Sequence, residues 1–160
     1  MSEQKLRRIQ QRGGDCVESV QGNCAQSVLV ALREDFPVID GIPLNALTVM
    51  SGTALRGETC GAVCGALFTI GMLSAPAESE FLEALPVTLP VAARFCDAFE
   101  QKFGSLICRN IHKKIFGRTY DLSDSMQQQE FLEAGGLTKC RAPVETASRI
   151  VAEIFFDKES

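Results

Sequence analysis

The stretch GETCGAVCGALFTIGM, residues 57–72, decides the fold of this chain. It lies in an uncharged run, from Cys60 to Ala77, that reaches the lower length limit of a transmembrane helix. Strongly apolar residues are few in this run. Glycines, hydroxyl residues and a proline interrupt it, namely Gly61, Gly65, Gly71, Thr69, Ser74 and Pro76. We therefore expect a helix buried in the core of a soluble protein, with no insertion into a membrane.

Helical periodicity continues on both sides of this stretch, and strand-type alternation is hard to find. The expected helices cover residues 3–12, 24–36, 43–51, 60–72, 86–103, 105–116, 124–134 and 143–155, with a short further stretch at 16–20 and a linker at 75–83. Gly13-Gly14 and Gly135-Gly136 are expected to end the helices that precede them. The pattern predicts an all-α fold, a single-domain multi-helix bundle over residues 1–160, with 1–14 as an N-terminal helix or arm.

The charge and the aromatic content argue against a nucleic-acid function. The formal net charge is −4, whereas nucleic-acid-binding domains usually carry a clustered basic surplus. The chain has no Trp and one Tyr, so it is poorly supplied with side chains for base stacking.

Seven cysteines are the unusual feature of the composition. The N-terminal segment MSEQKLRRIQQRGG is polar and has no apolar region typical of an export signal, so a cytoplasmic location is expected. Thiols stay reduced in that compartment, and a high cysteine count there indicates metal binding or redox chemistry before a disulfide scaffold. Some of the seven are expected to be small buried apolar residues and nothing more.

Four of the cysteines fall at or near expected helix N-termini. They are Cys24 after Asn23, Cys60 after Thr59, Cys108 after Ser105, and Cys140 before Pro143. Asn, Thr and Ser are suitable N-cap residues. Unpaired N–H groups and the helix dipole stabilise negative charge at such positions, which favours the thiolate form. The four positions are therefore candidates for metal ligands or reactive thiols.

The other three cysteines are secondary redox or ligand candidates. Cys64 follows Cys60 by four residues and shares its helix face, so both could touch a metal or exchange a disulfide. The alternative is that Cys64 fills space beside Gly65, where a neighbouring helix approaches. Cys16 and Cys96 carry no spacing signal of their own, since the chain has no CxxC pair and no zinc-finger spacing.

Three segments resemble a known family. GNCAQSV (22–28), GETCGAVCGALFTIG (57–71) and FGSLICRNI (103–111), followed by a late Cys140, resemble the C_GCAxxG_C_C family, whose members are described as redox-active. The resemblance covers about residues 20 to 155 and implies that Cys24, Cys60, Cys108 and Cys140 are the family positions. The order around Cys60 is C-G-A where the family name has G-C-A, so the match is not letter for letter. Similar domains occur joined to haem-carrying cytochrome segments, which implies electron transfer; this chain has no CxxCH for haem attachment.

Three readings of the four cysteines stay open at this point. The first is a four-thiolate metal site holding an iron–sulfur cluster, [2Fe–2S], in an electron carrier or redox sensor with a redox partner protein. The second is metal-free thiol–disulfide chemistry, with Cys64 or Cys16 as a resolving partner. The third is structural zinc in a module that binds a partner.

The remaining candidates are weaker. His112 is the one histidine, and in RNIHKK it is expected to be a solvated surface residue. A local basic patch around it, formed by Arg109, Lys113, Lys114 and Arg118, complements a helix C-terminus or docks an acidic redox partner. Gly61 and Gly65 allow close helix approach, in the core or across a dimer interface. We expect the core for these two glycines, and a homodimer as the assembly.

Overall fold

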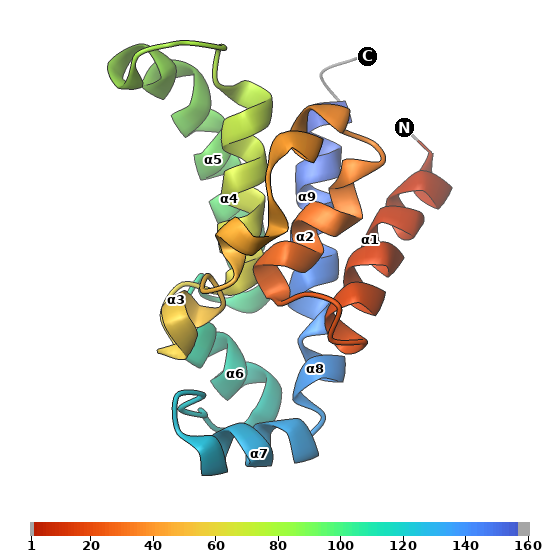
Figure 1. Ribbon diagram of the computed structural model, residues 1–160, viewed down its shortest axis with the longest axis vertical. Helices are drawn as coiled ribbons and strands as arrows, with labels where there is room; N and C mark the ends of the chain where they lie inside the picture. The colour runs from red at the N-terminus through yellow and green to blue at the C-terminus, as the bar shows by residue number, and fades with distance from the viewer. Residues whose placement is uncertain (1, 157–160) are drawn as a thin grey trace.

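Helices form nearly all the regular structure of the chain. A computed structural model describes residues 2–156 and has no named strand among them, which confirms the all-α prediction (Figure 1). The longer helices are α1 (Glu3–Glu18), α2 (Cys24–Arg33), α4 (Gly61–Ser74), α5 (Phe81–Phe103), α6 (Cys108–Phe116), α7 (Ser125–Glu133) and α9 (Arg141–Phe156). The short ones are α3 (Gly52–Leu55), α8 (Gly136–Lys139) and the 3₁₀ helices η1 (Pro37–Gly41) and η2 (Leu44–Leu47).

Helix α1 does not end at Gly13-Gly14 as predicted but continues to Glu18. The two glycines serve close packing instead of termination. A Cβ at Gly13 would lie 3.0 Å from a methyl of Val144 in α9, and one at Gly14 would lie 2.2 Å from the Glu145 carboxylate. Helix α1 therefore packs closely against α9, and Figure 1 shows the two side by side.

The first half of helix α4 is buried in the core, as the sequence predicted. It packs against α2, α5 and α9, and its residues Ala62, Val63 and Ala66 are fully buried. Gly65 is the closest point, where a Cβ would lie 2.4 Å from the carbonyl oxygen of Ala25 in α2. The small residues of the deciding stretch thus let two helix backbones approach within the core. Across residues 2–156, none of the helices combines the length and the apolar character needed to cross a membrane.

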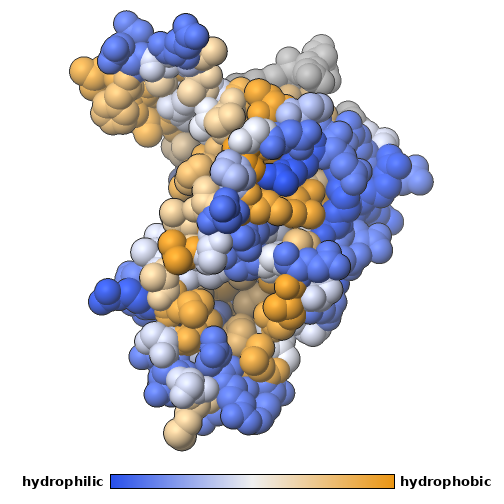
Figure 2. Space-filling view, viewed as in Figure 1, coloured by the Kyte–Doolittle hydropathy of each residue, from blue (hydrophilic) through white to orange (hydrophobic). Residues whose placement is uncertain are grey.

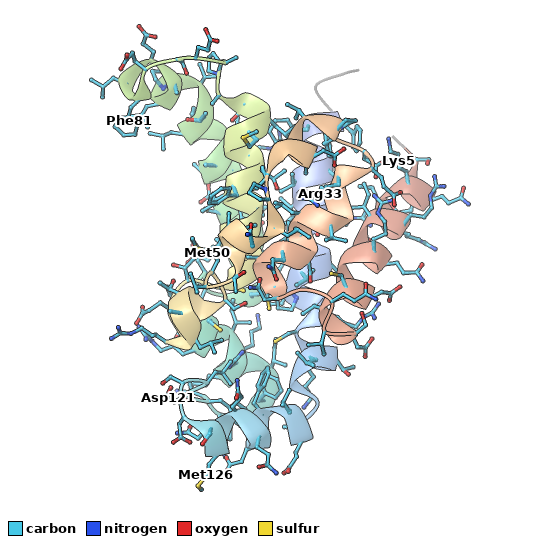
Figure 3. The ribbon with its side chains drawn as sticks, viewed as in Figure 1. Lys5, Arg33, Met50, Phe81, Asp121 and Met126 are labelled. Atoms are coloured by element: carbon cyan, nitrogen blue, oxygen red, sulfur yellow. The ribbon has the colours of Figure 1, made fainter. Side chains whose placement is uncertain are left out.

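Helix α5 begins at Phe81, earlier than the predicted residue 86, and contains Pro86 and Pro90. Its first turns and the end of α4 project from the body, with Phe81 at the tip (Figures 1 and 3). Several large apolar side chains are exposed along these two helices: Phe68, Met72, Phe81, Leu82, Val87 and Leu89.

The lower part of the molecule has a small apolar cluster of its own. Tyr120, Phe131 and Cys140 form it, together with partly buried neighbours that include Cys24 and Phe116. Figure 1 shows α6, α7 and α8 below the main bundle, with α3 beside them. Cys24 also packs against the main core, so it lies where the two clusters meet.

Candidate functional site

Each of the four family-position cysteines lies at a helix boundary, as the sequence predicted. Cys24 is the first residue of α2, Cys60 is the N-cap of α4, Cys108 is the first residue of α6, and Cys140 directly precedes α9. Two predicted caps differ in detail. Cys60, and not Thr59, is the N-cap of α4, and Ser105 accepts from the N–H of Ile107 just before α6.

Backbone pairing brings Cys60 and Cys108 together. The segments that precede α4 and α6 run antiparallel, with a bridge between Thr59 and Ile107. The Cys60 N–H donates to the carbonyl of Leu106 at 2.9 Å, and the Cys108 N–H donates to the carbonyl of Glu58 at 2.6 Å. Two cysteines 48 positions apart are thereby fixed at the starts of neighbouring helices.

A capping box fixes the start of α2 and with it Cys24. The Asn23 side chain accepts from the N–H of Gln26, and the Gln26 side chain accepts from the N–H of Asn23. The Asn23 amide also donates to the carbonyls of Leu47 and Thr48, each at 2.9 Å. These two hydrogen bonds connect the start of α2 to the segment that leads into α3. The predicted cap is confirmed and has this additional anchoring role.

Ion pairs hold the boundary at Cys140. Arg141, the next residue, pairs with Asp15 and Glu18 at the end of α1 and with Glu145 one turn later in α9. These pairs join the start of α9 to the end of α1 and so define where Cys140 lies.

The four cysteines line one cavity of about 820 Å³. Its walls come mainly from α2, α3, α6, α7 and α8 and from the loops before α2, α4 and α7, with single residues from α1, α4 and α9. Figure 2 shows a hollow in the lower half of the visible face, bordered by hydrophobic residues. Among the described residues that line it, none is Asp, Glu, Lys or Arg. The cysteine thiols are thus the main ionisable groups of this cavity.

The Cys24 and Cys140 thiols interact with each other. Their side-chain hydrogen bond lowers the pKa of Cys24 and raises the pKa of Cys140, and burial raises the latter further.

The other two thiols resist ionisation. Burial, with the nearby Cys24 and Cys108, raises the pKa of Cys60 well above its usual value, although the N–H groups of Ala62 and Val63 oppose this. Burial, with Cys24 and Cys64, raises the pKa of Cys108 to about 12. Several thiolates cannot coexist in this apolar cavity unless positive charge compensates them.

His112 is part of the site, contrary to the expectation of a solvated surface residue. Its side chain is buried, with 4% exposure, and Nε2 lies 3.6 Å from Cys108 Sγ and 4.0 Å from Cys140 Sγ. The ring stacks on Phe131, and burial lowers the pKa of His112, which favours the neutral imidazole. The sequence signal was the four-residue spacing from Cys108, which places both side chains on one face of α6.

Glycines make room around the sulfurs. A Cβ at Gly61 would lie 2.9 Å from Cys24 Cβ, and one at Gly52 would lie 3.4 Å from Cys108 Sγ. Gly52 also has a φ of 53°, in the left-handed region that favours glycine. These positions let the α3 and α4 backbones pass directly beside the cysteines.

The three secondary candidates lie outside the cavity wall. Cys64 lies close enough to Cys108 to help raise the pKa of that thiol. Cys16 is buried in α1, where its Sγ would be 3.2 Å from a Cβ at Gly22. Cys96 lies on α5, where burial and then Asp97 raise its pKa.

The donor set suits a soft metal or a cluster, because thiolates and imidazole prefer such metals. Across residues 2–156, no three or more His, Cys, Asp or Glu side chains are close enough, as they stand, to bind one metal ion together. The four cysteines are all unpaired thiols that face the same cavity. Protonated thiols are neutral and do not attract one another, whereas thiolates bind a shared cation and come closer together.

Comparison with known proteins finds one family. Residues 22–154 match the profile described as "Putative redox-active protein (C_GCAxxG_C_C)". No curated protein and no solved structure matches the chain.

Proposed function

The chain belongs to the C_GCAxxG_C_C family of putative redox-active proteins, and from this premise we propose that Cys24, Cys60, Cys108 and Cys140 hold a [2Fe–2S] cluster. The cluster would serve electron transfer or redox sensing with a partner protein. The observation that carries the proposal is the convergence of four thiols, from four helix boundaries, on one cavity.

Charge compensation favours a metal group over free thiolates. The described cavity lining contains no Lys or Arg, and burial holds the pKa of Cys60, Cys108 and Cys140 above its usual value. Iron would replace the thiol protons and supply the missing positive charge, and the helix N-termini would stabilise the remaining negative charge. His112 Nε2 is in reach of two of the sulfurs, where an N–H would stabilise their charge.

The test is anaerobic purification followed by the visible spectrum and by iron, acid-labile sulfide and zinc analysis. We expect a coloured protein with two iron and two sulfide per chain. Cys108→Ser should lose most of the iron, whereas Cys96→Ser, on α5 outside the cavity, should keep it. Circular dichroism of both variants confirms folding. A colourless, iron-free wild-type protein would sink the cluster proposal.

A second candidate function is metal-free thiol–disulfide exchange, favoured by the Cys24–Cys140 pair. The pair joins a thiol with a lowered pKa to its hydrogen-bond donor, which suits an attacking thiolate and its partner. Oxidation would join the two sulfurs and pass two electrons and two protons to a partner disulfide, which becomes two thiols. An iron-free protein that forms a Cys24–Cys140 disulfide, read by mass spectrometry, would favour this candidate. Zinc at one per chain, with no iron, would favour the structural-zinc reading.

A further inference from the structure

The cavity extends well beyond the sulfurs, toward solvent. Exposed apolar side chains surround its opening: Val20, Val49 and Leu132 are 72%, 62% and 51% exposed. Its volume of about 820 Å³ lies within the roughly 300–1,000 Å³ range typical of sites for small organic ligands. The four sulfurs thus lie in a space large enough for a further molecule.

The rim of the opening is held in an unfavourable backbone conformation. Val20, Ala54 and Leu55 have φ values of 59°, 58° and 64° and all line the cavity. A β-branched residue such as Val rarely adopts this left-handed region. Strained residues of this kind cluster at ligand sites, where the surrounding structure maintains them.

Aromatic rings form part of the wall beside the sulfurs. His112 stacks on Phe131 with ring centroids 5.1 Å apart, and Tyr120 contacts Phe131 edge-on at 5.7 Å. Such a wall offers flat apolar faces to a ring-shaped ligand.

We propose that this cavity binds a neutral quinone-type ring next to the cysteine sulfurs. The uncharged lining selects a ligand without formal charge, and the aromatic wall selects a flat one. The choice of a redox-active ring rests on the proposed function. The binding of a neutral flat ring in this cavity does not depend on the proposed function.

The chain has a built-in reporter for such binding. Tyr120 is the one Tyr, and the chain has no Trp, so ultraviolet emission reports from the cavity wall. The probe is tetramethyl-1,4-benzoquinone, whose methyl groups occupy the ring positions at which thiols would form stable adducts. Titration should give saturable quenching of tyrosine emission after correction for absorbance. Anthraquinone-2-sulfonate, which is charged, should bind at least tenfold more weakly.

A matched pair of variants locates the site. Leu132→Glu places a charge on the rim and should weaken quinone binding at least tenfold. Met126→Glu is the control, because Met126 is an exposed apolar residue of the same helix that does not line the cavity and projects from the lower end of the molecule (Figure 3). It should leave the affinity within twofold of wild type.

Several outcomes would overturn the inference. They are the absence of saturable quenching, equal binding of the neutral and charged probes, and equal affinity of the two variants. The inference would also be overturned if the wild-type protein were a dimer that does not bind the quinone and Leu132→Glu dissociated it. The rim would then be the contact with a second copy of the chain. Iron analysis of the same samples separates the two proposals. Quenching without iron refutes the cluster alone, and iron without quenching refutes the quinone site alone.

Discussion

Replacing Gly65 by Ala tests how the central helix positions the site. The added Cβ would lie 2.4 Å from the Ala25 carbonyl oxygen, whereas ordinary contact begins at 3.4 Å. The blocking atom is backbone, so α2 and α4 must part by about 1 Å. Overpacking of this kind costs about 1–3 kcal/mol, against a helix-propensity gain of about 1 kcal/mol for Ala over Gly. Because the blocking atom is backbone, we expect an overpacking cost at the upper end, about 3 kcal/mol, which leaves a net loss of about 2 kcal/mol after the propensity gain.

Gly71 supplies the matched control, since it lies in the same helix and a Cβ there meets nothing within 4 Å. Gly71→Ala should be neutral or stabilising by up to about 1 kcal/mol. Thermal and urea unfolding of both variants measures the difference. A loss of about 2 kcal/mol corresponds to a Tm about 4–8 °C lower for a chain of this size. Equal stability of Gly65→Ala and Gly71→Ala would refute the close approach of α2 and α4.

Three further predictions follow from the site and the surface. Because burial, with Cys24 and Cys64, raises the Cys108 pKa to about 12 from 9.0, the unfolded chain loses this proton first above pH 9. Cys108 should then lower the unfolding free energy of the metal-free reduced protein by about 1.4 kcal/mol per pH unit up to pH 12, in addition to the contributions of other thiols. Cys108→Ala should make the pH slope in urea melts shallower by that amount, and identical slopes would contradict the prediction. His112→Phe keeps the aromatic stack but removes the hydrogen-bonding nitrogens, so redox titration of the iron-loaded protein should give a lower midpoint potential, and an unchanged potential would rule out contact with the sulfurs. Leu82, 74% exposed on α5, should lie in the expected homodimer interface; sedimentation should show a dimer that Leu82→Asp dissociates, and a monomeric wild-type protein would refute this.

Local sequence signals predicted the starts of α2 and α7 correctly. Asn23 and Asp124 accept hydrogen bonds from the N–H groups three residues on, as their side-chain chemistry implies. The start of α2 at Cys24 could therefore be predicted from residues 23–26 alone.

Other features depended on neighbours distant in sequence. Gly13-Gly14 resembled a helix terminator, but side chains of α9 pack closely against both glycines and the helix continues. His112 looked solvated because its neighbours in the chain are polar, yet Phe131 and Tyr120 arrive from later segments to bury it. The pairing of segments 57–60 and 106–109 has no local signal, since it joins two stretches that form no regular sheet.

The central claim is that four cysteines from four helix boundaries act together on one metal group. Iron K-edge X-ray absorption of the anaerobically purified protein tests it most directly. The account predicts an all-sulfur first shell with a neighbouring iron, as in a [2Fe–2S] cluster ligated by four thiolates. An iron shell of nitrogen and oxygen, or no protein-bound iron at all, would contradict it.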